Sequence, residues 1–389
     1  MLAKSLLWGS VVVGTRPPGV NRKIRFLVAC LFLLPLITSQ ASAQTFEELS
    51  AQAAAAGDQN NPTRAIELYT QALQLNPKSS EAWWFLGSLQ YRVESYGPAI
   101  VSFSHYIELM PNAAPALALR GLCEFETGDY QQALTDIQKG ISLGAANDPR
   151  HEQILHYHEA MLLTRLGRFE DALTSYSFFA DKQISSPELM LAIGLAGLRM
   201  PILPAELKPD QQELVGTTGA AGYQFMSGDT KGGHQAFANL FQKFPAAQNA
   251  HYFYAYLLFP KDPDSALAEF QNELQVAPEN LDALIMTAWV LLMEDRASEA
   301  LPFSQRAVHQ NANSATAQLV LGRSLMETEN LKDGLVHLEA ALKLEPNDLE
   351  VHVALAKAYS KLGRKEEARN QRMLCLQLTR SGGAQLANR

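Results

Sequence analysis

The sequence is poor in cysteine, which excludes a fold held together by a disulfide framework. Only three cysteines occur among 389 residues, whereas small extracellular disulfide domains carry several pairs. Proline and glycine, with 19 and 24 residues, are not enriched, so collagen-like and proline-rich chains are excluded as well. Hydrophobic residues make up 47% and charged residues 19% of the chain, a balance that is typical of a folded protein with a sizeable core.

Basic residues are scarce outside the first 43 positions. That segment holds five basic residues and no acidic one, and the rest of the chain has 27 basic against 40 acidic residues. A domain with this excess of negative charge is a poor binder of phosphate backbones and of anionic lipid. The composition therefore argues against nucleic acid as a partner.

Residues 1–43 have the pattern of a secretory signal peptide. A basic cluster at 21–25 precedes the apolar run Phe26–Ile37, and small residues ending in Ala43 follow it. This order predicts cleavage after Ala43 and export to the periplasm or out of the cell. The apolar run has 12 residues, fewer than the roughly 17 that a membrane-spanning helix needs. Residues 1–20 precede the basic cluster and make the signal unusually long. In the alternative interpretation they are a non-native N-terminal extension, and the signal begins after them.

The rest of the chain repeats with a period of 34 residues. Small residues recur at this spacing, and glycines and prolines elsewhere in the repeat keep the same step. The positions are Ala65, Ala99 and Ala133, then Ala266, Ala300, Gly334 and Ala368, with the pairs Gly87 and Gly121, and Pro77 and Pro111. Because proline and turn residues interrupt every half-period, each repeat is predicted to consist of two helices rather than one.

Local signals support helices in each half-period. Ala99, Phe103 and Tyr106 lie at spacings of four and three, which places them on one face of an amphipathic helix. Two antiparallel helices approach closely only where one side chain is small, which explains the recurring glycine and alanine. Predicted helix starts are Thr45 with Glu48, Asp148-Pro149, Ser186-Pro187 and Asp262-Pro263, and predicted left-handed helix ends are Gly57, Gly128, Gly167 and Gly363.

This pattern resembles the tetratricopeptide repeat. The resemblance is carried by Trp83, Leu86, Gly87, Ala99, Phe103 and Pro111, and again by Gly322, Leu325, Leu338, Ala341 and Pro346. It covers nearly all of residues 45–380. It implies an all-α fold, a right-handed superhelical solenoid of about 8–10 helix-turn-helix repeats, irregular in the middle, with the first helix of each repeat lining the concave side.

Breaks in the period divide the chain. The step from Ala133 to Ala172 is 39 residues, and the next step, to Ala236, is 64. Three prolines between positions 201 and 209 exclude a second helix there. We therefore expect an N-terminal stack at 44–183, an irregular segment at 184–246, a C-terminal stack at 247–380 and a disordered tail at 381–389.

The sequence contains no motif for catalysis. It has no phosphate-binding loop, zinc-binding helix, nucleophile turn or haem site. His151, His156 and His158 are five and two residues apart, so they do not share a helix face as metal ligands would. We expect no enzyme activity, no catalytic residue, no metal and no cofactor. Cys123 and Cys375 are expected to be two separate buried thiols, because repeats contact only their neighbours.

The helix phase set by Trp83 and Gly87 predicts which residues face the concave side. Such surfaces bind peptides that aromatic side chains anchor. The candidate partner-binding residues are Trp84, Tyr91, Phe125, Tyr157, Trp289, Arg323, Lys357 and Lys361. In the alternative interpretation these side chains pack against the adjacent first helix.

Repeats that fill the chain and a signal peptide together predict a non-catalytic protein–protein interaction scaffold of the bacterial cell envelope. It would bind peptide or helical segments of other envelope proteins in its concave groove, without a membrane span after signal cleavage. The alternative function is a carbohydrate- or small-molecule-binding module that uses the concave aromatic residues. The sequence does not name the partner.

Overall fold

A computed structural model of the chain describes residues 44–146, 148–259 and 261–387, with side chains as far as residue 380. These residues form 19 α-helices and one 3-10 helix, and no strand occurs among them. The predicted all-α class is therefore confirmed. The predicted signal peptide lies outside the described residues. None of the described helices combines the length and hydrophobicity needed to cross a bilayer.

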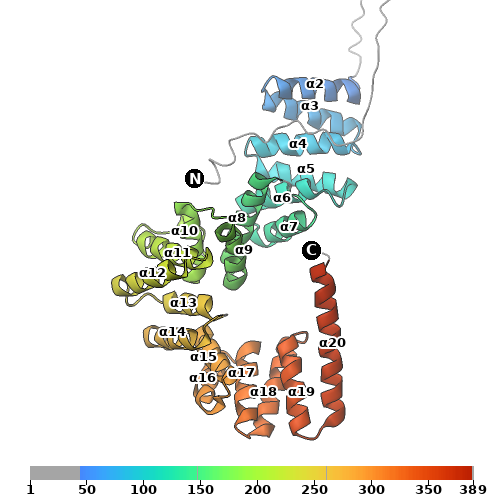
Figure 1. Ribbon diagram of the computed structural model, residues 1–389. Coiled ribbons are helices and arrows are strands. Elements are labelled where there is room, and N and C mark those ends of the chain that lie inside the picture. Colours follow the sequence, from blue (N-terminus) through green and yellow to red (C-terminus); the bar gives the residue numbers. More distant parts are fainter. Residues whose placement is uncertain (1–43, 147, 260, 388–389) are drawn as a thin grey trace, which may run out of the picture. The chain divides into compact units, whose positions relative to one another are not determined.

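The helices form two compact units, which divide after Leu166. The first unit consists of three helix pairs that follow one another along the chain and of a seventh helix, α8. Its helices are α2 (Phe46–Asp58), α3 (Pro62–Leu75), α4 (Ser80–Arg92), α5 (Tyr96–Leu109), α6 (Ala114–Thr127), α7 (Tyr130–Ser142) and α8 (Pro149–Arg165). Each pair packs on the next, as Figure 1 shows for α2/α3 and α4/α5, and α8 packs on α7 and α6.

The second unit begins at Gly167 and contains twelve α-helices in its described residues. From α13 onward its helices again form pairs, and each pair contacts the next. Its elements are α9 (Phe169–Asp181), α10 (Pro187–Gly197), η1 (Pro204–Glu206), α11 (Gln212–Met226), α12 (Thr230–Lys243), α13 (Ala250–Leu258), α14 (Pro263–Val276), α15 (Leu281–Met293), α16 (Ala297–Gln310), α17 (Ala315–Glu327), α18 (Leu331–Leu344), α19 (Leu349–Lys361) and α20 (Lys365–Ala387).

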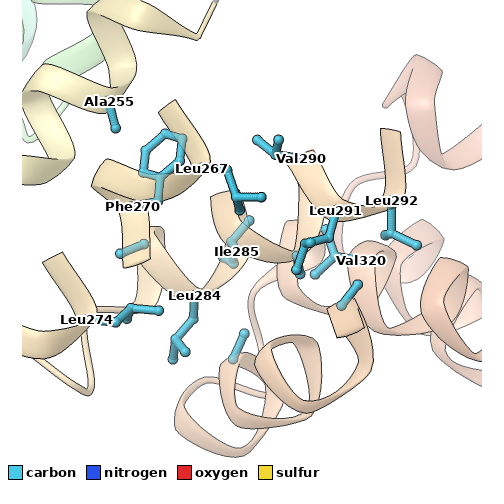
Figure 2. Close-up of a cluster of buried hydrophobic side chains, with 14 of the residues drawn as sticks. Ala255, Leu267, Phe270, Leu274, Leu284, Ile285, Val290, Leu291, Leu292 and Val320 are labelled. Carbon is cyan, nitrogen blue, oxygen red and sulfur yellow. The ribbon is translucent and has the colours of Figure 1, made fainter. Parts of the chain in front are cut away.

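Successive pairs share one continuous core. Figure 2 shows side chains from α13, α14, α15 and α17 meeting in such a cluster in the second unit. Phe270 of α14 is fully buried, and Val320 of α17 joins the same cluster. A single pair cannot bury its apolar face alone, so each pair depends on its neighbours for stability.

The recurring small residues lie at the helix crossings, as the period predicts. The alanines of the 34-residue register are at most 2% exposed. A Cβ atom added to Gly87 would lie 2.9 Å from Phe103, and one added to Gly322 would lie 2.7 Å from Leu338. The bulky residue of the second helix therefore occupies the space that the glycine of the first helix leaves empty.

Most of the predicted helix boundaries are confirmed. Thr45 and Glu48 form a reciprocal capping box, and each of the three predicted Asp/Ser-Pro starts has its cap and its proline at the first position. Gly128, Gly167 and Gly363 have positive φ. Gly57 was predicted wrongly, because α2 continues to Asp58 and Asn60 takes the left-handed conformation instead.

Helix α9 belongs to the second unit, although the sequence placed it in an N-terminal stack ending at residue 183. It packs on α10 and α11. The Glu170 side chain of α9 pairs with Arg199, which follows α10, and accepts a hydrogen bond of 3.3 Å from the Tyr252 hydroxyl of α13. These polar contacts hold α9 against the middle helices. The 34-residue spacing of small residues does not predict them.

Helices α10 and α11 approach each other more closely than the regular pairs. Between them, residues 198–211 form no α-helix, and the prolines at 201, 204 and 209 lie in this connection. A Cβ atom on Gly194 would lie 1.9 Å from the carbonyl oxygen of Val215, and one on Gly219 would lie 1.7 Å from that of Met190. The two backbones are therefore in direct contact.

Helix α13 begins without a cap from its own sequence. Asn249 precedes it with φ of 66°, and its side chain does not cap the N-terminal amides of the helix. The buried carboxylate of Glu273, on α14, accepts hydrogen bonds from the backbone N–H groups of Asn249 at 2.7 Å and Tyr252 at 3.3 Å. A carboxylate near a helix N-terminus also interacts favourably with the helix dipole, so α14 supplies the cap of α13.

The C-terminal helix is longer than its partner. α20 has 23 residues against 13 in α19 (Figure 1). Residues 381–387, which we expected in a disordered tail, form its last turns. Gly382 and Gly383 have low helix propensity, so local propensity does not explain why the helix continues through this stretch.

We predict that Gly219→Ala destabilises the second unit. The new methyl group would overlap the Met190 carbonyl, so α10 and α11 would have to separate, and overpacking of this kind typically costs about 1–3 kcal/mol. Gly216→Ala on the same helix is the matched control, because its Cβ would meet only Leu191 at 3.6 Å. Thermal unfolding measures both, and equal midpoints for the two variants would contradict the close approach.

Candidate functional site

The predicted concave residues of the second unit form a ladder with a spacing of one repeat. Trp289, Arg323 and Lys357 are 34 residues apart and lie on the first helices α15, α17 and α19. The Arg323 guanidinium carbon lies 4.8 Å from the centroid of the Trp289 ring, within the range of a cation–π interaction. The register of the sequence therefore brings these side chains to one face of neighbouring helices.

Glu327 connects the next two members of the ladder. One of its carboxylate oxygens lies 2.5 Å from the Lys357 ammonium, and the other lies 2.7 Å from that of Lys361. Burial acts to raise the pKa of Glu327, but its hydrogen bonds to the two lysines outweigh burial and lower that pKa. The carboxylate is thus ionised at neutral pH and is shared by two cations.

A small pocket opens between α17 and α19, with Leu338 of α18 in its wall. Its volume is about 180 Å³. The charged residues around it are Arg323, Glu327, Glu350 and Lys357, and the apolar ones are Met326, Leu338, Val353, Ala354 and Ala358. Val353 is 49% exposed. The pocket therefore combines charged groups of both signs with an accessible apolar surface.

Arg323 carries a charge that no carboxylate neutralises directly. Burial lowers the pKa of its guanidinium, and the nearby charges of Glu350 and Glu327 oppose this effect. Neither carboxylate is close enough to form an ion pair with it, and its N–H groups make no hydrogen bond with the described part of the chain. The ring of Trp289 is its direct partner.

Two other partly buried arginines are fully paired. Arg120 donates to both carboxylate oxygens of Asp136, at 2.5 and 3.0 Å, and to Ser104. Arg199 pairs with Glu170 and, at 2.8 Å, with Asp282, and its guanidinium also lies over two aromatic rings, those of Phe169 and Tyr252. Both arginines form ion pairs within the fold, whereas Arg323 forms none with the described residues.

The predicted groove residues of the first unit contribute to its core. Trp84 and Tyr91 pack against the cluster around Phe103, and Trp84 lies 5.4 Å from the Tyr106 ring. Burial is the main cause that raises the pKa of Tyr91. These two aromatic side chains contribute to helix packing in the first unit.

Phe125 and Tyr157 meet at a buried histidine. Their rings lie 5.0 and 6.0 Å from that of His158, and both contacts are edge-on. His158 donates a hydrogen bond from its Nδ1 atom to the carbonyl oxygen of Ile154, at 2.7 Å, and burial lowers its pKa. Since His158 is the shared neighbour, this cluster is part of the packing of α6 and α8.

Metal ligands do not gather among the described residues, where no three His, Cys, Asp or Glu side chains lie close enough to hold an ion. His151 and His156 contact the acids Asp148 and Glu159 of their own helix region. Both described cysteines are free thiols; Cys123 is buried, whereas Cys375 is only partly buried, contrary to the expectation.

Three residues of the second unit were not expected from the sequence, namely Glu327, Glu350 and the paired Arg199. Glu327 had a detectable signal, because it lies four residues after Arg323 and one period before Lys361. The partners of Arg199 lie 29 and 83 residues away along the chain, so no local spacing identifies them.

Models of one protein family match three segments of the chain. Both models are described as tetratricopeptide repeat, and they match residues 50–100, 261–315 and 325–371. These segments are tetratricopeptide repeats. The family match confirms the repeat type for these three segments, and the long segment between residues 101 and 260 lies outside them.

Curated relatives match over short stretches. Protein FlbA of Caulobacter vibrioides is 25% identical over 117 residues, which cover 30% of this chain and 19% of that protein. The bovine (Bos taurus) protein SGT1 homolog is 27% identical over 89 residues, 23% of this chain and 26% of that protein. The chain thus matches about a quarter or less of the length of these relatives.

Solved structures with similar helices have low TM-scores. YrrB, described as a tetratricopeptide repeat protein with an unusual peptide-binding site, is 20% identical with a TM-score of 0.37, covering 42% of this chain and 86% of its own. MamA from Desulfovibrio magneticus RS-1 is 19% identical with a TM-score of 0.39, at 42% and 94% coverage. Yeast Tom70 is 16% identical with a TM-score of 0.35, at 86% and 76% coverage.

The first unit contains a buried carboxyl group with an unusual pKa. Glu124 is 5% exposed, and its Oε2 atom has no hydrogen-bond partner among the described residues. Burial and the charge of Asp136 raise its pKa to about 8, against the opposing effect of Arg120; Asp129 adds a smaller increase. The Arg120 guanidinium is already hydrogen-bonded to both carboxylate oxygens of Asp136. Glu124 therefore keeps its proton at neutral pH.

We predict that Glu124→Gln weakens the pH dependence of stability. Between its ordinary pKa of 4.5 and about 8, the folded chain holds a proton that the unfolded chain releases. The free energy of unfolding therefore falls as pH rises through this window, by up to about 1.4 kcal/mol per pH unit. Glutamine cannot ionise, so urea-unfolding midpoints of the variant should fall less steeply. The control is Glu366→Gln, at an exposed site; parallel curves for all three proteins would exclude this role.

Proposed function

We propose that this protein is a non-catalytic scaffold that binds peptide or helical segments of other proteins. The observation that carries the proposal is the pocket between α17 and α19, which lies on the face formed by Trp289, Arg323 and Lys357. Stacked repeats repeat this face from one first helix to the next, and extended surfaces of this kind suit elongated partners.

The composition of the pocket supports a protein partner. Arg and aromatic residues are enriched where protein interfaces bind most strongly, and Arg323 over the Trp289 ring provides both. The volume of about 180 Å³ is below the roughly 300–1,000 Å³ of small-molecule sites. A single side chain of a partner segment fits this space better than a cofactor does.

We further propose that the protein is exported and acts in the bacterial cell envelope. The support is the order of a basic cluster, an apolar run and small residues in the first 43 positions. The partners would then be other envelope proteins. The acidic balance of the rest of the chain disfavours nucleic acid and anionic lipid as alternatives.

Export predicts a shorter mature chain. When the full chain is produced in a Gram-negative host, we expect N-terminal sequencing of the periplasmic fraction to start at Gln44. Deleting residues 26–37 removes the apolar run and should leave the protein uncleaved in the cytoplasm. An uncut chain in the cytoplasm of cells producing the unaltered protein would contradict the proposal.

Partner binding at the pocket predicts position-dependent crosslinking. A photo-reactive p-benzoylphenylalanine in place of Val353 should form adducts with a small set of proteins in cells of the source organism, identified by mass spectrometry. The control is the same replacement at Val336, which is 62% exposed on α18 and does not line the pocket. Equal adduct yields at the two positions would show that the pocket is not the binding site.

A further inference from the structure

The unpaired charge of Arg323 indicates which chemical group a bound partner would place in the pocket. A guanidinium taken partly out of water loses solvation that only a hydrogen-bonded anion fully restores. Arg120 and Arg199 receive that anion from the chain itself, whereas Arg323 lines an open pocket without one. The guanidinium carbon of Arg323 lies over the Trp289 ring at 4.8 Å, and its N–H groups make no hydrogen bond within the described part of the chain, so they are available to a ligand.

The neighbouring acids do not fill this role. Glu327 is held by Lys357 and Lys361, at 2.5 and 2.7 Å, so both of its oxygens are already engaged. Glu350 is exposed on α19 and forms no ion pair with Arg323. The lysines also offset the negative charge of Glu327, which lowers the repulsion that an incoming carboxylate would meet at the pocket.

We propose that Arg323 binds the carboxylate of an Asp or Glu side chain in the partner segment. This inference rests on the proposed function and adds the chemical class of residue that the pocket selects. The planar guanidinium can hold a carboxylate through two parallel hydrogen bonds, which give both strength and orientation. Val353 and Ala354, beside Arg323 in the pocket, would contact an apolar residue next to the acidic one.

The pocket size favours a side chain as the source of the carboxylate. Its volume of about 180 Å³ accepts one side chain and leaves the rest of the segment on the surface of α17 and α19. The partner motif is therefore an acidic residue flanked by apolar ones, bound within a segment that continues beyond the pocket on both sides.

An array of short end-capped peptides tests this inference on the purified full chain. Each peptide is made in three versions, with Glu, Gln or Lys at one central position between leucines, and binding is measured by fluorescence anisotropy. We expect the Glu versions to bind about tenfold or more tightly than the Gln versions, the effect of a charged hydrogen-bond partner. Arg323→Gln should abolish this preference, and Arg323→Lys should keep only part of it.

Arg364→Gln is the matched control. Arg364 also lies over an aromatic ring, that of Tyr359, at 4.5 Å, but it is already paired with Glu367 at 2.8 Å. This variant should keep the preference for Glu, and circular dichroism melting of each variant excludes a loss of fold as the cause of weaker binding.

The outcomes separate the inference from the proposed function. Equal binding of Glu and Gln versions, or an unchanged preference in Arg323→Gln, would overturn the role of Arg323 while leaving peptide binding in place. Preference for a free C-terminal carboxylate on the Gln versions would overturn the assignment to a side chain. Absence of binding by every peptide would count against both proposals.

Discussion

The paired helices of this chain pack closely at positions where one residue is glycine or alanine. The glycines at 87 and 322 on first helices leave space that Phe103 and Leu338 of the second helices fill, and the alanines of the 34-residue register, on the second helices, are buried. Interiors pack as densely as organic crystals, so this fit allows little sliding of one helix along the other. The spacing of small residues thus fixes the rotation of every first helix about its axis.

That fixed rotation determines which residues can act together. With each first helix held in the same phase, residues one period apart reach the same face, and Trp289, Arg323 and Lys357 become neighbours. Glu327 and Lys361 follow the same rule four residues later. The pocket is therefore a product of the repeat itself and requires no inserted loop or extra domain.

The parts of the structure that obey the period could be predicted from the sequence, and the parts that depart from it could not. The helix pairs, their proline-marked starts and the ladder on α15, α17 and α19 all follow from local spacing. The packing of α9 with α10 and α11 depends instead on Arg199, whose partners Glu170 and Asp282 are distant in sequence. Trp84 and Tyr91 were placed on the correct helix, but whether an aromatic ring at that position faces solvent depends on the size of its neighbours.

The cap that Glu273 of α14 provides for α13 couples the unfolding of these two helices. The N-terminal amides of α13 have this carboxylate as their acceptor, so α13 loses its terminal hydrogen bonds whenever α14 detaches. Opening of α14 alone would leave those amides without a protein acceptor, which raises the free energy of any state in which α13 stays folded. These two helices should therefore open and close as one cooperative unit in hydrogen exchange.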